Sequence, residues 1–540
     1  SDVCSSDLWY EIRVSGDGHL CAAGRVDIMV AMNAETYADD VADVAPGGVF
    51  IYDSSWPRER QLAREGVRLI GIPLANLVND LFDVPRTRIL MKNMAYFGAL
   101  VPLLNIDMDL VESLIKERLG SKKGLLEANM QAIEVGRQYA LEHFDCPLPT
   151  HVERMDRTEG HVLMDGNTAA GLGCVYAGAT VGAWYPITPS TSLMDAFKAY
   201  CDATRVNKET GERNYCIIQA EDELGAMGMV LGASWAGARA FTSTSGPGVS
   251  LMSELLGYAN FTEIPVVLFD VQRVGPSTGL PTRTQQSDVL SCVYASHGDT
   301  RQVVLFPANP SECFEMALTA FDAAERLQTP VIVLTDLDIG MNDWMIPELT
   351  WDEAYQPDRG KVLDAQALEA AESFRRYADV DGDGIPYRSW PGVHPKGGYF
   401  TRGSGHNEAA QYTERADDYK ALMDRLRRKM DGAPKYLPAP IVKPAKGATR
   451  MGIIAYGSSD NATLEALDAL ARDGVPMDYL RVRAFPFHDE VQAFIDAHDQ
   501  VFVVEQNRDA PLKTLLLSED RKSTRLNSSH SSVSRMPSSA

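Results

Sequence analysis

The chain has 540 residues, of which 45% are hydrophobic and 23% are charged, and its formal net charge is −23. This length allows roughly three or four domains, and the composition is that of a globular protein with a buried core. The acidic balance, without a basic stripe, excludes a protein that binds the nucleic-acid backbone. No apolar run reaches the roughly 18 residues of a membrane span, so we expect no membrane partner.

Eight cysteines are spread along the sequence, and none of them stands in a C-x-x-C pair. Protein metal and iron–sulfur sites commonly hold cysteines at that spacing, so we expect no metal site in this chain. Most of the cysteines lie in apolar stretches, which predicts buried free thiols and a cytoplasmic location.

The two ends differ in composition from the rest of the chain. Residues 1–8 precede an abrupt, strand-like stretch that starts at Trp9 and Tyr10, and residues 521–540 are Ser-rich and aperiodic. We expect both segments to be foreign to the protein or disordered. The first domain is then expected to lack a strand at its beginning, which would bare an edge of its sheet.

Residues 9–145 alternate between short apolar runs and amphipathic segments, a pattern that predicts an α/β domain. The expected strands are 26–32, 48–53 and 67–74, and the expected helices are 93–105, 109–120 and 124–144. Residues 146–160 have the composition of a linker.

The alternation returns in residues 161–345, with many small side chains. A helix is predicted in GNTAAGLGCVYAGA, with Asn167 as its N-cap. Strand-like runs follow at 180–187, 215–220, 239–244, 265–271, 301–306 and 330–336. Because strands joined by helices run parallel, we predict a doubly wound parallel sheet here.

The last third of the chain divides into three stretches. Residues 346–432 are a polar excursion with few strand patterns, ending in the charged helix DDYKALMDRLRRKM. A Pro-rich linker at 433–450 leads to a small α/β domain at 451–517, whose strands are MGIIAYGSS, MDYLRVRAF and VFVVEQN. The predicted fold is therefore a central doubly wound α/β domain flanked by two smaller α/β domains.

Polar groups stand at the carboxyl ends of four strands predicted for the central sheet. They are Tyr185–Ser190, Glu221–Glu223, Thr242–Gly248 and Gln272–Arg273. Ligands of open α/β sheets bind at this edge, so these groups predict a pocket. Scattered loop polarity would give a similar pattern.

The central domain resembles the α subunit of the 2-oxoacid:ferredoxin oxidoreductases in four stretches, which occur in the same order: YPITPST, QAEDELGAMGMVLGAS, TSTSGPGVSLMSE and VQRVGPSTGLPT. The similarity is closest to the 2-oxoglutarate-type members in their fused γ–α form. WYEIRVS resembles the γ part, and VFVVEQN resembles the second domain of the α subunit. The resemblance covers about residues 9–517, and four ordered stretches are far more specific than YPITP alone.

The resemblance implies an enzyme that decarboxylates a 2-oxoacid with thiamine diphosphate, passing the acyl group to coenzyme A and the electrons to ferredoxin. It implies a γ-type domain at 9–145, a pyrimidine-binding domain at 161–345 and a transketolase C-terminal-type domain at 451–517. Mg²⁺, the diphosphate site and a [4Fe–4S] cluster are expected in a β subunit, within an α₂β₂-type hetero-tetramer. 2-Oxoglutarate is the expected substrate. Pyruvate, branched-chain 2-oxoacids, indolepyruvate or a non-catalytic docking role are the alternatives.

Thr188 matches the family's threonine that contacts the substrate. Pro186 and Pro189 stiffen the backbone around Thr188, which would hold its hydroxyl in place. The alternative is a plain proline turn with Ser190 as a helix N-cap, which leaves Thr188 unexplained.

Glu223 matches the glutamate that hydrogen-bonds the aminopyrimidine of thiamine diphosphate, where a carboxylate favours the imino form of the ring. The alternative is an acidic helix start stabilised by the helix dipole, which suits Glu221 and Asp222 better. Thr244, Ser245 and Gly246 are expected to approach the cofactor as a Gly-containing loop, although a simple tight turn explains them equally well.

Arg273 matches the arginine that binds the substrate carboxylate, and a guanidinium suits this role because it binds carboxylates in a bidentate manner. A structural salt bridge is the alternative. Arg283 is the second candidate for substrate binding.

Two motif-like features lie in Asp379–Gly384. The stretch starts like a calcium loop, but Trp390 stands where that loop needs an acidic residue. Its Gly-Asp-Gly resembles the Mg²⁺-diphosphate motif of thiamine enzymes, but no buried strand precedes it and Ile385 and Pro386 follow it. We expect a polar turn.

Overall fold

The computed structural model describes residues 10–22, 24–56, 59–120 and 123–519. The segments expected to be foreign, 1–8 and 521–540, lie outside the described residues. The chain divides between Arg157 and Thr158 into two compact units, unit 1 and unit 2.

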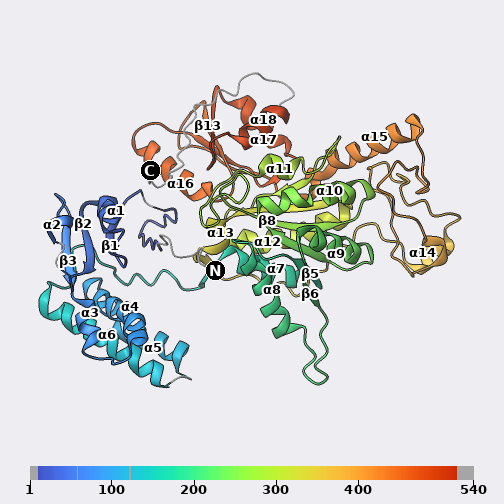
Figure 1. The fold of residues 1–540 in the computed structure, drawn as a ribbon. Coiled ribbons are helices and arrows are strands. Elements are labelled where there is room, and N and C mark those ends of the chain that lie inside the picture. Colours follow the sequence, from blue (N-terminus) through green and yellow to red (C-terminus); the bar gives the residue numbers. More distant parts are fainter. Residues whose placement is uncertain (1–9, 23, 57–58, 121–122, 520–540) are drawn as a thin grey trace. The chain divides into compact units, whose positions relative to one another are not determined.

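Unit 1 contains a parallel three-stranded sheet in the order β1–β2–β3 (Figure 1). Its elements are β1 (Val26–Val30), α1 (Tyr37–Asp43), β2 (Val44–Asp53), α2 (Glu59–Leu62), β3 (Arg68–Ile72), α3 (Leu74–Asn79), α4 (Pro85–Leu103), α5 (Met108–Leu119) and α6 (Lys123–His143). The three predicted strands and three predicted helices are confirmed. They form because each run has a continuous apolar face, and α4 packs that face against β2 and β3.

The strand-like stretch after Trp9 is not a strand over the residues that the structure describes, because residues 10–15 pair with no sheet. Tyr10, Ile12 and Val14 alternate as a strand requires, but their side chains are 71%, 75% and 72% exposed. A period-two pattern makes a strand only where one face is covered and a neighbour accepts the hydrogen bonds.

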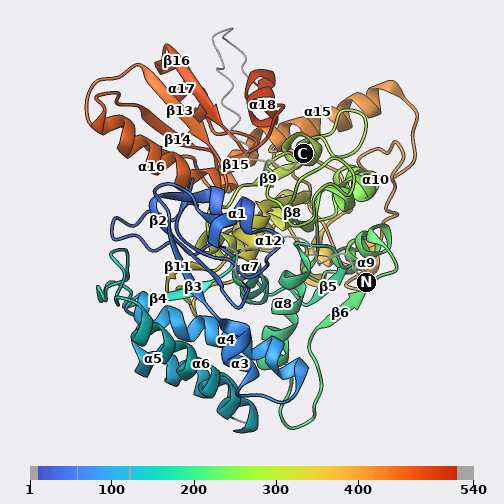
Figure 2. The same ribbon diagram turned by 60° about the vertical axis from the view of Figure 1, so that its left-hand side comes forward.

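Unit 2 is built on a seven-stranded sheet (Figures 1 and 2). Its strands, in spatial order, are β15 (Ala484–Phe485), β9 (Val303–Leu305), β10 (Pro330–Asp336), β8 (Val266–Gln272), β7 (Ala240–Thr244), β5 (Val181–Trp184) and β6 (Cys216–Gln219). All neighbours run parallel except β15, which is antiparallel to β9. The predicted doubly wound parallel sheet is confirmed.

Helices cover both faces of this sheet. One layer consists of α7 (Gly166–Tyr176), α8 (Thr191–Thr204) and α12 (Pro310–Leu327). The other consists of α9 (Glu223–Trp235), α10 (Gly246–Thr262) and α11 (Val289–Val293). Further elements are α13 (Leu337–Met341) and the antiparallel pair β4 (His161–Met164) and β11 (Trp344–Pro347).

The C-terminal part of unit 2 forms a four-stranded sheet in the order β12–β14–β13–β16, coloured orange to red in Figure 2. Its elements are β12 (Ile441–Lys443), β13 (Met451–Ala455), α16 (Ser459–Arg472), β14 (Asp478–Arg481), α17 (Asp489–Ala497), β16 (Gln500–Val504) and α18 (Pro511–Glu519). This small α/β arrangement agrees with the expected fold class. The predicted limits between the domains of unit 2 stay predictions.

The predicted single strand MDYLRVRAF is in fact two strands in two sheets. β14 remains in the small sheet, whereas β15 crosses to the edge of the central sheet and pairs with β9. Arg481, at the end of β14, binds Glu312 at the start of α12 through two contacts of 2.6 and 3.0 Å. This buried ion pair holds the crossing point in place.

The polar excursion contains α14 (Ala365–Ala370) and α15 (Ala416–Gly432), with short 3₁₀ turns at Pro395–Gly397 and Ala433–Tyr436. The charged helix predicted there is α15. It packs on the end of α10 through Glu263, which is fully buried and lies 2.7 Å from Arg425 and 2.8 Å from Lys429. The excursion is therefore fastened to the central domain by a buried ion triad.

The carboxylates of Asp379–Gly384 serve ion pairs, as a polar turn requires. Lys361 Nζ lies 2.6 Å from Asp381 and 2.9 Å from Asp383, and Arg428 binds Asp379 at 2.5 Å. Among the described residues, no helix combines the length and the apolar character needed to cross a bilayer.

Candidate functional site

The four polar strand ends predicted from the sequence lie next to one another. They follow β8, β7, β5 and β6, which are consecutive neighbours in the central sheet and run parallel. Their carboxyl ends therefore form one edge, which we call the carboxyl edge. Ligands of open α/β sheets bind at such an edge.

Thr188 and Arg273 come together at this edge. Arg273 Nη1 donates a hydrogen bond of 2.6 Å to the carbonyl oxygen of Thr188. Thr188 is exposed, whereas Arg273 is only 7% exposed. Burial lowers the pKa of Arg273, and the nearby carboxyl of Asp288 opposes that shift. The Arg273 guanidinium is thus anchored on the backbone of Thr188.

Asn167 hydrogen-bonds to the turn that carries Thr188. This side chain donates bonds of 2.8 Å to the Pro189 carbonyl and to the Ser192 hydroxyl. The prediction that Asn167 caps its own helix is wrong, because Asp165 is the N-cap of α7 and accepts from the Thr168 amide. The side-chain amide of Asn167 is thereby free to hydrogen-bond to the turn that carries Thr188.

Ser190 lies at the N-cap position of α8, as predicted, but its side chain makes no capping bond. It donates instead to the Ile187 carbonyl at 3.3 Å, inside the turn. Thr191 accepts from the Ile187 amide at 3.1 Å. The hydroxyls of this turn therefore stiffen the loop rather than the helix.

Glu223 is the first residue of α9 and is 8% exposed. The capping role belongs to Asp222, whose carboxylate accepts from the Gly225 amide at 2.7 Å. Glu221 and Asp222 are both exposed. The acidic helix start suggested by the sequence is thus Asp222, and Glu223 is left as a buried carboxylate with no capping role.

Gly248, in the first turn of α10, lies against both Glu223 and Thr244. A Cβ atom at position 248 would lie 1.9 Å from Thr244 Oγ1 and 3.0 Å from Glu223 Cγ. No residue with a side chain fits that space. The loop after β7 and the start of α9 therefore pack directly against each other.

Three hydroxyls of β7 and of the following residue have no hydrogen-bond partner among the residues that the structure describes. They belong to Thr242, Ser243 and Ser245, and all are buried. Ser245 occupies the N-cap position of α10 without capping it. An unsatisfied buried polar group costs about 1–3 kcal/mol, so such groups at one edge indicate a place where a ligand binds.

Asp288 completes the edge and was not predicted. A Cβ at Gly246 would lie 2.6 Å from Asp288 Oδ2, an atom that is buried and has no partner among the described residues. Burial raises the pKa of Asp288 to about 6, although bonding to Ser287 and the charge of Arg273 oppose the rise. A carboxyl with this pKa, beside Gly246 and Arg273, changes charge near neutral pH.

Asp270 in β8 is a second unpredicted carboxyl. It is fully buried, its pKa is raised well above the usual value by burial and by Asp288, and Cys292 donates to it at 3.3 Å. The sequence carried one hint of it, a charged residue in the apolar run PVVLFDVQ. That signal is weak, because a single charged residue in a strand usually faces solvent.

Gln286 ties the carboxyl edge to the C-terminal part of unit 2. Its amide donates to the Tyr456 carbonyl at 3.1 Å, Ser459 donates to its side-chain oxygen at 2.8 Å, and Asn507 donates to its main-chain carbonyl at 2.7 Å. Asn507 belongs to the VEQN stretch. Because these partners are distant in the sequence, no local pattern could reveal the network.

Arg283 lies on the loop that follows Arg273. Its carbonyl accepts from the Val274 amide at 3.0 Å, and its Nη1 donates to the carbonyl and hydroxyl of Thr282 at 3.0 and 3.1 Å. The loop thus returns to the edge, and the Arg283 guanidinium bonds to Thr282 within it. Among the described residues, no group of three or more His, Cys, Asp or Glu side chains is arranged to hold a metal ion.

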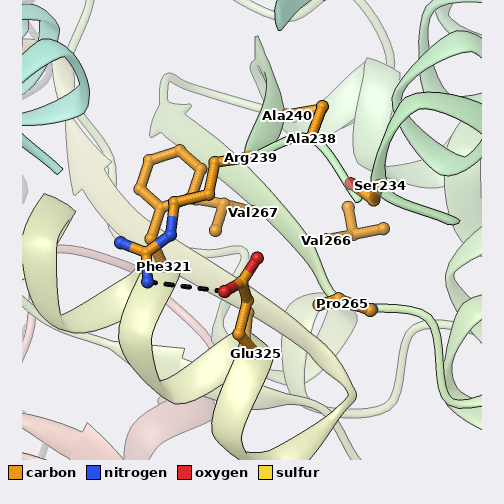
Figure 3. A pocket seen from close by; sticks show the side chains of 10 residues that line it. Ser234, Ala238, Arg239, Ala240, Pro265, Val266, Val267, Phe321 and Glu325 are labelled. Atoms are coloured by element: carbon orange, nitrogen blue, oxygen red, sulfur yellow. Dashed lines mark hydrogen bonds and ion pairs between the residues drawn. The ribbon is translucent and has the colours of Figure 1, made fainter. Parts of the chain in front are cut away.

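A small cavity lies at the opposite edge of the sheet, which we call the amino edge (Figure 3). Ser234, Pro265 and Phe321 line it, and Arg239 points across it to Glu325 at 3.5 Å. Both charges are nearly fully buried. This cavity is filled by an ion pair and is separate from the carboxyl edge.

Family models match two segments of the chain. Residues 172–370 match the thiamine diphosphate-binding domain of pyruvate flavodoxin/ferredoxin oxidoreductases, and residues 6–139 match the pyruvate ferredoxin/flavodoxin oxidoreductase family. The first segment contains Thr188, Glu223, Arg273 and the loop after β7. The second falls in unit 1.

Relatives with curated names align along most of the chain. Subunit alpha of 2-oxoacid:ferredoxin oxidoreductase 2 from Aeropyrum pernix is 30% identical over 96% of this chain and 86% of the relative. Subunit KorA of 2-oxoglutarate oxidoreductase from Mycobacterium tuberculosis is 29% identical over 92% of this chain and 77% of the relative. The solved 2-oxoglutarate:ferredoxin oxidoreductase of Magnetococcus marinus, with 2-oxoglutarate, coenzyme A and succinyl-CoA bound, has a TM-score of 0.83 at 28% identity, covering 94% of this chain and 86% of the other.

Proposed function

The chain belongs to the 2-oxoacid:ferredoxin oxidoreductases as an alpha subunit, and we propose that it is the γ–α subunit of a 2-oxoglutarate-specific, CoA-acylating member. The reaction would convert 2-oxoglutarate and CoA to succinyl-CoA and CO₂ and reduce ferredoxin. The observation that carries the proposal is the bond between Arg273 and the Thr188 backbone at the carboxyl edge. It couples the proposed carboxylate-binding group to the proposed substrate-contacting turn.

The described residues fit the aminopyrimidine half of thiamine diphosphate. Glu223 is a buried carboxylate free of capping duty, and the hydroxyls of Thr242, Ser243 and Ser245 lack partners. When bound, the cofactor supplies the carbon that adds to the 2-oxo group and takes up the electron pair released with CO₂. Glu223 would hold a proton shared with a ring nitrogen, which a carboxylate in a largely buried setting does well.

Arg273 would bind the substrate carboxylate and fix its orientation. A guanidinium keeps its charge throughout the pH range of the enzyme and presents donors in a fixed plane. Thr188, held by the Arg273 and Asn167 bonds, would place its hydroxyl against the substrate. Arg283 is the second candidate for a carboxylate contact. Thr244, Ser245 and Gly246 would line the cofactor side.

An alpha subunit works with a partner, and we propose that the partner is a β subunit that supplies Mg²⁺, the diphosphate site and a [4Fe–4S] cluster. The complete assembly would be an α₂β₂-type hetero-tetramer in the cytoplasm, with ferredoxin as the electron acceptor. The scattered cysteines of this chain support the placement of the cluster elsewhere, because cluster ligands need close spacing in space.

The test is 2-oxoacid-dependent viologen reduction by the chain co-expressed anaerobically with its β partner. We expect reduction with 2-oxoglutarate, and loss of it when CoA or this chain is omitted. Pyruvate, a branched-chain 2-oxoacid and indolepyruvate are the parallel substrates. Faster viologen reduction with one of these substrates would change the proposed substrate but not the proposed mechanism. Full activity of the β partner alone would make this chain a docking subunit.

A further inference from the structure

A narrow pocket at the amino edge of the central sheet is lined by positively charged and aromatic side chains. It lies between the end of α9, the start of β8 and the excursion. Its polar and aromatic lining consists of Trp235, Arg376, Arg388, Ser389, Trp390, Tyr399 and Glu263, whose carboxylate is paired with Arg425 and Lys429. Its interior has room for about one water-sized body.

Four nitrogen atoms in these walls are buried and have no hydrogen-bond partner among the described residues. They are Arg376 Nε, Arg376 Nη1, Arg388 Nε and Trp390 Nε1. Arg376 is 2% exposed and Arg388 is 4% exposed. Buried donors are nearly always satisfied in folded proteins, so four unsatisfied donors around one pocket call for an acceptor inside it.

Each arginine makes one hydrogen bond, and its Nε has no partner among the described residues. Arg376 Nη2 donates to the Glu263 carbonyl at 2.9 Å, and its guanidinium lies 4.9 Å from the centre of the Tyr377 ring. Arg388 Nη2 donates to the Arg359 carbonyl at 3.0 Å. Both guanidinium groups are therefore held in place while their other donors stay unpaired.

Arg239, in the adjoining cavity of Figure 3, has partners on both terminal nitrogens, although its Nε has none among the described residues. Its Nη1 donates to the Ala177 carbonyl at 2.7 Å, and its Nη2 donates to Asp322 at 2.7 Å and faces Glu325 at 3.5 Å. Carboxylates thus neutralise Arg239 directly. The hydrogen bonds of Arg376 and Arg388 reach only neutral carbonyls, and Arg388 shares the Glu325 carboxylate with Arg239 and Arg359 at the longer distance of 3.8 Å.

Buried cations outnumber buried carboxylates around this edge, five to two. The cations are Arg239, Arg376, Arg388, Arg425 and Lys429, and the carboxylates are Glu263 and Glu325. The half-buried Arg359 and Asp322 add one charge of each sign. The C-terminal ends of α9 and α10 contribute about half a negative charge each, which leaves a positive excess.

The pKa values agree with that excess. Burial lowers the pKa of Arg388 to about 10; the charge of Glu325 opposes the fall, and the charges of Arg376 and Arg359 add to it. Burial lowers the pKa of Lys429 to about 8; Glu263 opposes the fall, and Arg425 and Arg376 add to it. A negative charge between the arginines would oppose both shifts.

We propose that this pocket binds a chloride-sized monovalent anion, which accepts hydrogen bonds from Arg376, Arg388 and Trp390. The anion joins the excursion to the ends of α9 and α10, so its binding stabilises the folded chain. The walls of Trp235, Trp390 and Tyr399 and the small interior select against larger anions. The anion site is separate from the carboxyl edge. The proposal therefore does not depend on which 2-oxoacid is the substrate.

The test uses the full chain, purified in sodium gluconate, with sodium bromide replacing gluconate at constant ionic strength. Binding is read from the thermal midpoint, from the fluorescence of Trp235 and Trp390, and from an anomalous bromide peak in crystals. We expect saturable stabilisation and a peak between Arg376 and Arg388. Inorganic phosphate at the same concentration is expected to have no saturable effect.

Arg388→Gln and Arg376→Gln should weaken bromide binding at least about tenfold, because each removes a charged donor. Arg375→Gln is the matched control, since Arg375 is 58% exposed and pairs with the exposed Glu408. Should either glutamine variant fail to fold, Trp390→Phe decides, because it removes one donor and keeps the ring.

Three results would overturn the proposal. The first is the absence of any saturable bromide effect on the unsubstituted chain. The second is undiminished bromide binding by the folded glutamine variants or, if they do not fold, by Trp390→Phe. The third is binding of phosphate without binding of bromide.

Discussion

The two edges of the central sheet treat their polar groups in opposite ways. At the carboxyl edge, hydroxyls of Thr242 and Ser245 have no partner among the described residues, and Thr188 is exposed. At the amino edge, Glu263 is held by Arg425 and Lys429 in a buried triad. An edge that receives a ligand keeps donors and acceptors unused, whereas an edge that only holds the chain together pairs them. The pocket between Arg376 and Arg388 is a place on the amino edge where several buried donors lack partners among the described residues.

The carboxyl groups of the two edges also differ in their pKa values. Burial raises the pKa of Asp288 at the carboxyl edge to about 6. At the amino edge, the charges of Arg425 and Lys429 outweigh the effect of burial and lower the pKa of Glu263 to about 2. A buried carboxyl without a firm cation partner thus favours its proton, and a paired one gives it up.

The strongest test of the carboxyl edge is Glu223→Gln in the complete enzyme. We expect kcat to fall about 10²–10⁴-fold, because a positioned proton-holding group contributes that much, while the thermal midpoint stays within about 2 °C. Glu221→Gln is the matched control, since Glu221 is exposed two residues away. Viologen reduction measures both. Equal losses in the two variants would remove Glu223 from the proposed site.

The strongest test of the amino edge is Glu263→Ala. We expect the free energy of unfolding to fall by about 3–5 kcal/mol, because Arg425 and Lys429 would stay buried without their partner. Urea unfolding measures this. Glu408→Ala breaks the exposed pair with Arg375 and should cost less than about 1 kcal/mol. A small effect at Glu263 would mean that the excursion is held mainly by apolar packing.

The contributions of the two edges to the free energy of unfolding should change with pH in opposite directions. Asp288 binds its proton more tightly in the folded chain, so its contribution to stability is complete below about pH 4 and declines as the pH rises to about 6. Glu263 holds its proton less tightly when folded, so its contribution is complete above about pH 4.5 and declines toward pH 2.

Each carboxyl should account for up to about 3 kcal/mol over its own range. Asp288→Asn is expected to flatten unfolding free energies between pH 4 and 6, and Glu263→Gln those below pH 4.5. Urea midpoints measured at half-unit pH steps would check both. Parallel pH profiles for the two variants would contradict the assigned directions.

Arg273→Gln is expected to have the smallest effect of these substitutions. It tests which arginine at the carboxyl edge binds the substrate carboxylate. The KM for the 2-oxoacid should rise about 10–100-fold, as expected for one charged hydrogen-bonding partner, with a smaller change in kcat. Arg283→Gln is the control on the same loop and should change KM less. If Arg283→Gln has the larger effect, the carboxylate contact belongs to that residue.

Much of the carboxyl edge was predictable because its strands have clear local sequence patterns. Thr188, Glu223 and Arg273 each follow an apolar strand run, and parallel strands bring such ends to one edge. Asp288 and Gln286 were not predictable, since their partners at Gly246 and Asn507 are far away in the sequence. Local sequence patterns also gave a wrong helix cap and a wrong strand, which are described next.

The helix cap and the strand show why local patterns can fail. Asn167 is a good N-cap residue, yet Asp165 two residues earlier takes the cap and frees Asn167 to brace the Pro189 turn. MDYLRVRAF has the composition of one strand, but Arg481 bonds to Glu312 and β15 continues in another sheet. In both cases a tertiary contact overrides a pattern that is correct as far as it goes.

The crossing of β15 also sets the order in which a ribosome can complete this domain. β9 ends at Leu305 and its edge partner begins only at Ala484, so residues 306–483 must be translated before the pair can form. At roughly 5–20 residues per second, the nascent central sheet waits about 10–40 s with the β9 edge open. An open strand edge invites pairing with another chain, so chaperone capture or slow local translation after codon 305 would raise the yield of the folded protein.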